Sequence, residues 1–199
     1  MEFVKKHKGL VVLGVVVVVV LCLVGSLVGT YNTMATRKEG ISNMKSEIQV
    51  MLQRRADLIP QLMGTVKGAV GAETKYMTDV IEARSGLSKA VDTADMQQMA
   101  NANANMTDKL QIMVNALHES YPEFTSSTQF TSLFDEIAGT QNRITVAQTN
   151  YNTSVRSYND YLVRFPNNIF AGMFGFSKET YFEATSPNVE QAPVIDFGY

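Results

Sequence analysis

The chain has 199 residues, of which 45% are hydrophobic, 18% charged and 9% aromatic, with only 5 prolines, and this composition excludes a disordered or linker-dominated protein. A formal net charge of −2 provides no positive field for phosphates, so nucleic acid is not an expected partner. A single cysteine, Cys22, excludes a disulfide framework and a zinc knuckle, and two histidines leave little material for a histidine-dependent site.

The first predicted element is a transmembrane helix over residues 9–30, which follows a short basic flank at residues 1–8. Residues 9–30 contain no charged side chain. A helix of this length spans about 33 Å at about 1.5 Å per residue, close to the thickness of a bilayer core. A removable signal peptide has an apolar core of only about 7–15 residues. We therefore expect a retained single-pass anchor, with the lipid bilayer as a partner.

The basic residues on the two sides of this helix bear on its orientation. Lys5, Lys6 and Lys8 precede it, whereas Arg37 and Lys38 follow it. By the positive-inside rule the first group favours a cytoplasmic N-terminus and an exported body. The second group makes the difference between the two sides small, so the reverse orientation stays open.

Two glycines inside the predicted span favour self-association. Gly25 and Gly29 are the candidate contact residues between anchor helices, because glycines four residues apart allow two helices to approach closely. Such pairs also occur by chance in spans that contain glycine. On this ground we expect a homo-oligomer without a defined number of subunits.

Residues 31–165 have the apolar spacing of packed helices, in which core positions recur at alternating intervals of three and four. The predicted core positions are Met34, Ile41, Met44, Ile48, Met51, Leu58, Leu62, Val66, Ala69, Tyr76, Val80, Ala83, Leu87, Met99, Met106, Leu110, Met113, Leu117, Phe130, Phe134, Ile137, Gln141, Ile144, Tyr151, Val155, Tyr158, Leu162 and Phe165. The predicted fold class is all-α: the transmembrane helix continues into an elongated, antiparallel up-and-down bundle of about four helices.

Polar residues interrupt these core positions. Arg55 and Asn103 both occupy core positions, and a charge in the core should be paired, for example with an acidic residue of another helix. Four asparagines of the last long helix have two open interpretations: hydrogen bonds between helices that set their register, or a solvated face. These are Asn142, Asn150, Asn152 and Asn159.

Helix boundaries follow from local chemistry. Pro60 predicts a kink or a boundary, since it lacks an amide hydrogen. Asp92 and Thr93 are candidate N-caps for the third helix, which we expect to end at Tyr121, before a proline. Ser126, with a glutamine three residues later, resembles a capping box for the fourth helix. The sequence Phe-Pro-Asn-Asn at residues 165–168 should end that helix.

The C-terminal tail, residues 166–199, is predicted to be irregular, first apolar and then acidic and extended. Residues 169–176 are apolar, and Phe170, Phe174 and Phe176 are candidate interaction residues. Two interpretations are open: the segment folds back over the end of the bundle, or it inserts an aromatic edge into the membrane or a neighbouring subunit. Two interpretations are also open for residues 194–197: they dock as an extended strand, or they remain mobile.

A set of short motifs in the right order resembles the LemA family. They are Gly-Thr-Tyr-Asn at 29–32, Gln-Arg-Arg-Ala-Asp-Leu-Ile-Pro-Gln-Leu at 53–62, Thr-Val-Lys-Gly at 65–68, Glu-Ala-Arg at 82–84, Tyr-Pro at 121–122, Thr-Gln-Asn-Arg-Ile at 140–144, Tyr-Asn at 151–152, Arg-Phe-Pro at 164–166, Gly-Met-Phe-Gly-Phe at 172–176 and Tyr-Phe at 181–182. They cover nearly the whole chain, although residues 96–106 depart from the family's charged style. The resemblance implies a bacterial membrane-anchored helical bundle, here expected in the cytoplasmic (inner) membrane, whose molecular role is not settled.

The sequence offers no constellation for catalysis. Cys22 lies in the span, His118 is next to Glu119 near a helix end, and Asp135 and Glu136 diverge on a helix. We expect no catalytic, cofactor or metal-binding residues and no enzymatic activity.

Arg54, Arg55 and Asp57 form the candidate polar site. They bind a protein partner or lipid headgroups, or they have a structural role beside Pro60. The favoured function is a scaffold that presents the bundle for protein contact or self-assembly, with an unidentified protein partner. The alternative is a membrane-tethered sensor or adaptor in envelope signalling or stress response.

Overall fold

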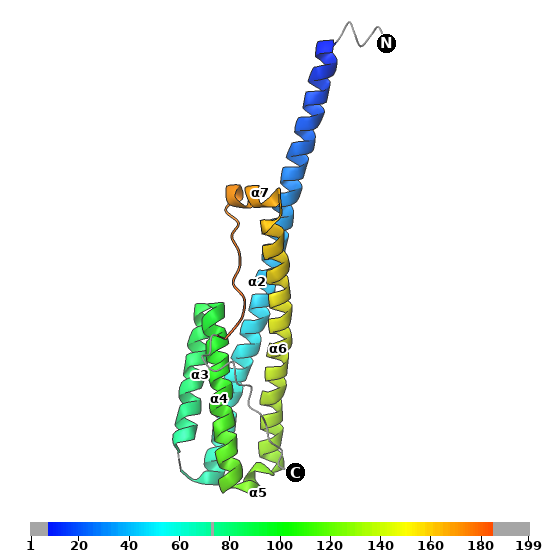
Figure 1. Ribbon diagram of the computed structural model, residues 1–199. Helices are drawn as coiled ribbons and strands as arrows, with labels where there is room; N and C mark the ends of the chain where they lie inside the picture. The colour runs from blue at the N-terminus through cyan, green and yellow to red at the C-terminus, as the bar shows by residue number, and fades with distance from the viewer. Residues whose placement is uncertain (1–7, 73, 185–199) are drawn as a thin grey trace, which may run out of the picture. The chain divides into compact units, whose positions relative to one another are not determined.

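The computed structural model describes residues 8–72 and 74–184, and this part of the chain is helical without strands (Figure 1). Its helices are α2 (Lys8–Val70), α3 (Lys75–Thr93), α4 (Met96–Ser120), α5 (Pro122–Thr125), α6 (Thr128–Val163) and α7 (Asn167–Phe174). The all-α prediction, with a long apolar N-terminal helix followed by packed helices, is confirmed. The basic flank at residues 1–7 and the predicted docking segment at 194–197 lie outside the described residues.

Helix α2 is a single helix of 63 residues that contains the predicted span. The most apolar 18-residue window of its N-terminal part contains no buried residue, and the helix is long and apolar enough to cross a membrane. Pro60 lies inside α2 and is therefore no boundary. Its neighbours Ile59 and Leu62 are fully buried, so packing holds the helix together where one amide hydrogen is missing. Gly71, at φ +75°, follows the helix and donates its N–H to Lys67 O, a left-handed cap that suits glycine.

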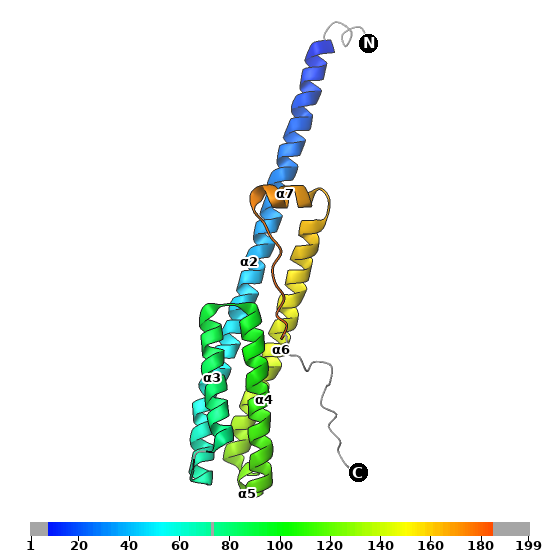
Figure 2. The same cartoon turned by 60° about the vertical axis from the view of Figure 1, so that its left-hand side comes forward.

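The described residues form two compact units, which we call the anchor unit (residues 8–41 and 154–179) and the bundle unit (residues 42–72, 74–153 and 180–184). Helices α2 and α6 contribute to both. In the bundle unit, α3 and α4 lie side by side (Figure 2). Its core is built largely from the predicted positions, together with buried residues that were not predicted, such as Leu52 and Ile59. Fully buried examples are Ile48, Leu62, Val66, Val80, Leu87, Met99, Met106, Met113, Leu117 and Ile144.

Two predicted core positions are exposed, and Met51 and Tyr76 are only half-buried, beside the buried Leu52 and Met77. Ala69 is exposed near the end of α2, and Phe165 is 81% exposed. Phe165 follows the end of α6, so the helical period that placed it in the core no longer applies there. The stop predicted around Pro166 is confirmed.

Two predicted caps are displaced along the chain. Asp92 and Thr93 belong to the last turn of α3, and Asp95 caps α4 by accepting a hydrogen bond from Gln98 N–H at 2.8 Å. Before α6, the Ser127 hydroxyl accepts from Phe130 N–H at 3.4 Å. Ser126 donates its hydroxyl to Pro122 O instead, because the short helix α5 precedes it.

The anchor unit joins the first part of α2 to the last part of α6. Arg37 donates to the Ser157 carbonyl and hydroxyl and lies 4.7 Å from the centroid of the Tyr161 ring. Lys38 pairs with Glu179 at 3.5 Å. The tail begins with α7, a helix that the sequence analysis did not predict, and Gly175 at φ +74° ends it.

Candidate functional site

The structure does not bring Arg54, Arg55 and Asp57 together in one patch. Successive residues of a helix diverge by about 100°, and here Arg55 is buried at 2% exposure whereas Arg54 and Asp57 are exposed. The candidate site therefore consists of two parts: a buried cluster around Arg55 and a surface that contains Arg54 and Asp57.

The Arg55 guanidinium donates hydrogen bonds to residues of two other helices of the bundle unit. Its Nη1 donates to Asn103 Oδ1 of α4 and to Gln141 Oε1 of α6. Its Nη2 donates to Thr107 Oγ1 at 3.1 Å. The sequence analysis expected an acidic partner, and this is wrong for the described residues, because all three acceptors are neutral. Asn103 and Gln141 occupy core positions of their own helices, which brings their amides to the interior opposite the arginine.

The Arg55 cluster holds a positive charge in the core of the bundle. Burial lowers the pKa of Arg55 to about 10, which leaves the side chain charged at neutral pH. Its Nε is buried without a hydrogen-bond partner among the described residues. A buried cation that lacks a carboxylate depends on every neutral acceptor around it, because each one replaces lost water.

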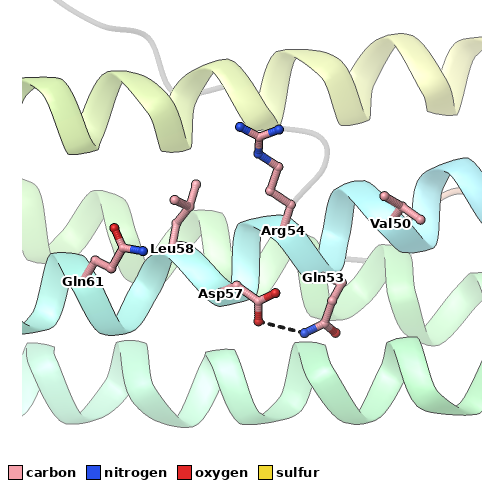
Figure 3. A pocket seen from close by; sticks show the side chains of 6 residues that line it. All are labelled: Val50, Gln53, Arg54, Asp57, Leu58 and Gln61. Atoms are coloured by element: carbon pink, nitrogen blue, oxygen red, sulfur yellow. Dashed lines mark hydrogen bonds between the residues drawn. The ribbon is translucent and has the colours of Figure 1, made fainter.

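Arg54 and Asp57 line a shallow hollow of about 370 Å³ on the exposed side of α2, together with Val50, Gln53, Leu58 and Gln61 (Figure 3). Gln53 donates to Asp57 Oδ1 at 2.8 Å, and Arg54 pairs with Glu136 of α6 at 3.0 Å. Val50 is 62% exposed. The hollow therefore combines an apolar side chain with a cation and a carboxylate nearly one turn apart.

The tail of the chain is bound by asparagines of α6, a role that the sequence analysis missed. In the anchor unit, the Asn159 side chain donates to Glu179 O and accepts from Glu179 N–H, at 3.0 and 2.9 Å. In the bundle unit, Asn152 makes the same two contacts with Phe182, at 3.1 and 2.8 Å. These two amides bind the backbone of the tail. They form neither the hydrogen bonds between helices nor the solvated face that the sequence analysis considered.

The remaining predicted site residues lie in the anchor unit. Phe174 and Phe176 place their rings edge-on to Tyr31, with centroids 5.2 and 5.5 Å apart, so this part of the tail does fold back onto α2. Phe170 is half-buried. Gly25 and Gly29 are exposed, and a Cβ added at either would meet no atom within 4 Å.

The described residues contain no group of three or more His, Cys, Asp or Glu side chains that could hold a metal ion. His118 Nδ1 lies 3.3 Å from the Thr125 hydroxyl, beside the short helix α5. The absence of catalytic and cofactor-binding residues stays a prediction.

We expect Arg54→Gln to change the free energy of unfolding by less than about 1 kcal/mol, because exposed ion pairs contribute little. The side chains of Arg54 and Glu136 are 54% and 41% exposed. Denaturant unfolding of the full chain in detergent, followed by circular dichroism, checks this. A loss of several kcal/mol would show that the ion pair between α2 and α6 has a structural role that its exposure does not indicate.

The amino-acid sequence matches one protein family and two known proteins. Residues 44–197 match the model of the LemA family. The chain is also 23% identical to the magnetosome proteins MamQ 1 and MamQ 2 of Paramagnetospirillum magneticum. Both alignments extend over 187 positions and cover 82% of this chain and 68% of each relative. The family match includes the Arg55 cluster, the hollow and α7.

Proposed function

The chain belongs to the LemA family, and from this premise we propose that it is a non-enzymatic, single-pass scaffold that presents its helical bundle at a bacterial membrane. One observation carries the proposal: α2 is a continuous helix from an apolar, exposed stretch into the buried core of the bundle unit. Helix α2 thus contributes residues both to the apolar stretch and to the core of the bundle unit. We place the protein in the cytoplasmic membrane, with its N-terminus in the cytoplasm and its body exported.

The hollow on α2 is the proposed contact surface for a protein partner. An amphipathic helix can dock its apolar side chains beside Val50 and Leu58 and present charges opposite to those of Arg54 and Asp57. Rim charges of this kind contribute chiefly to specificity and to the rate of association.

The proposed self-assembly involves the anchor as well. Gly25 and Gly29 lie on the exposed surface of α2, and a second anchor helix can approach closely at this pair. Because a Cβ added there would meet no atom of another described segment within 4 Å, larger side chains at these positions affect contacts between chains and leave the fold of one chain intact.

We expect the full chain in mild detergent to have the native mass of an oligomer, measured by light scattering after gel filtration. Gly25→Leu with Gly29→Leu should lower that mass, because leucines prevent close approach of two anchors. Val50→Arg should lower it if the hollow also contributes to self-assembly.

Ile112→Arg is the matched control for Val50→Arg, because Ile112 is a comparably exposed apolar residue of the bundle unit, at 52%. Its native mass should equal that of the unmodified chain. A monomeric unmodified chain would contradict self-assembly and leave binding of a different protein as the scaffold's role.

The continuity of α2 also favours a second candidate, a membrane-tethered sensor or adaptor in envelope signalling or stress response, since one helix contains both the apolar stretch and core residues of the bundle unit. Replacement of residues 9–30 by an unrelated transmembrane helix separates the two. A scaffold that acts through its bundle keeps its partner contacts, whereas a sensor read within the membrane loses its response.

A further inference from the structure

Helix α7 has an apolar outer face that the described part of the chain leaves exposed. Its Ala171 is buried and Phe170 is half-buried, so this side packs inward. On its other side Ile169 is 55% and Met173 65% exposed. No charged residue occurs between Phe165 and Ser177. A helix on a water-exposed surface normally presents charged and polar side chains outward, so this surface suits an apolar neighbour.

The position of α7 in the anchor unit identifies that neighbour. Tyr31 follows the apolar stretch at residues 9–30 directly, and that stretch matches the thickness of a bilayer core. Tyr31 therefore lies where the hydrocarbon core meets the headgroups, the level at which tyrosines are enriched in membrane proteins. The ring contacts of Phe174 and Phe176 with Tyr31 hold the end of α7 at the same level.

The direction of α7 and its flanking charges agree with this location. In both views α7 runs crosswise to the adjoining parts of α2 and α6 in the anchor unit (Figures 1 and 2). A helix that is crosswise to a membrane-spanning helix lies along the bilayer surface, as interfacial helices do. The first charged residues on either side of the apolar segment are Arg164 and Lys178, both exposed cations. Their charge is complementary to lipid phosphates.

We propose that α7 is an interfacial helix that inserts the face containing Ile169 and Met173 into the headgroup boundary of the bilayer that α2 crosses. The proposal rests on the membrane anchoring in the proposed function and adds a second contact with the same lipid surface. Two contacts restrict the tilt of the anchor unit relative to the membrane, which a single spanning helix does not do.

A single tryptophan tests the proposal, because the chain contains none. Met173→Trp reports on α7, Leu21→Trp on the anchor and Ile112→Trp on the bundle unit, and all three positions are exposed. Each full-length variant is placed in vesicles of phosphatidylcholine and phosphatidylglycerol whose acyl chains are unmodified, brominated near the headgroup, or brominated near the chain end, so that both the boundary and the centre of the bilayer are probed. Bromine quenches only tryptophans that contact the acyl chains.

We expect a blue-shifted emission and a loss of intensity in brominated vesicles for Met173→Trp and Leu21→Trp, and no loss for Ile112→Trp. If only Leu21→Trp is quenched and iodide in the water quenches Met173→Trp, α7 is solvated and the inference fails while the anchor stands. If neither bromine nor iodide quenches Met173→Trp, a protein surface such as a second copy covers α7, which also overturns it. An unquenched Leu21→Trp would overturn membrane anchoring and this inference together.

Discussion

Asn103→Leu is expected to lower the free energy of unfolding by about 2–3 kcal/mol, because it removes a buried acceptor from a charged donor. Asn103 is 6% exposed and accepts a hydrogen bond from the Arg55 guanidinium. Leucine has the same number and branching of side-chain heavy atoms and leaves no cavity, so the loss chiefly reports the missing hydrogen bond. Denaturant unfolding of the full chain in detergent measures it, with Asn105→Leu, at an exposed position of the same helix, as the control.

Adding Arg55→Met to Asn103→Leu should recover most of this loss. Apolar replacement of a buried charge together with its partner is commonly neutral or stabilising, whereas removal of one partner alone is costly. The double-mutant cycle of Arg55→Met and Asn103→Leu measures the coupling energy between the two side chains, and we expect the double variant to lose less stability than the sum of the two single variants. Losses that simply add would show that the stability supplied by Asn103 does not come through Arg55.

The pKa of Arg55 determines how this comparison depends on pH. Its folded-state pKa, about 10, lies below the ordinary value for arginine because of burial. Below about pH 10 both the folded and the unfolded chain hold the proton, so the full cost of burying the charge is present. Above that pH the unfolded state binds more protons, and stability rises relative to the Arg55→Met variant. The stability difference between the two proteins should therefore be constant through neutral pH and change only above about pH 10.

Phe182→Ala is expected to cost about 3–4 kcal/mol and to release the tail from the bundle unit, since a buried aromatic side chain is lost. Phe182 is 2% exposed. Its backbone is held by the Asn152 side chain and by Gln148, which donates to Phe182 O at 3.2 Å. Without the ring, these part-buried polar contacts compete with water and contribute only modestly.

Amide hydrogen exchange at residues 180–184, measured beside denaturant unfolding, distinguishes tail release from general destabilisation. We expect faster exchange there, with slow exchange retained in the core of α4. Thr180→Ala is the control, because the exposed Thr180 contributes its backbone carbonyl to the Tyr151 hydroxyl, and this contact survives the substitution. Unchanged exchange in Phe182→Ala would show that the hydrogen bonds alone hold the tail.

Local sequence chemistry predicted those features that depend on neighbours along the chain. An uncharged stretch such as residues 9–30 is apolar in any surroundings, and a spacing of three and four residues defines one face of a helix wherever that helix packs. The core positions at Ile48, Val80, Met106 and Ile144 follow from this period. The predicted N-cap residues were less accurate. Asp92, Thr93 and Asp95 are chemically equivalent candidates for the cap of α4. At α6 the preceding helix α5 engages Ser126, so Ser127 is the cap.

The sequence by itself therefore determined the all-α class, the apolar N-terminal helix, the helical core and the unusual polar residues within it. Only the tertiary structure decided that Arg55 meets Asn103 and Gln141. These two residues lie 48 and 86 positions after Arg55 in the chain, on other helices. The tertiary structure also decided that Asn152 and Asn159 bind the tail, since a side-chain amide pairs equally well with any free backbone. The direction of α7 was beyond prediction for the same reason: it depends on ring contacts with Tyr31, at the other end of the chain.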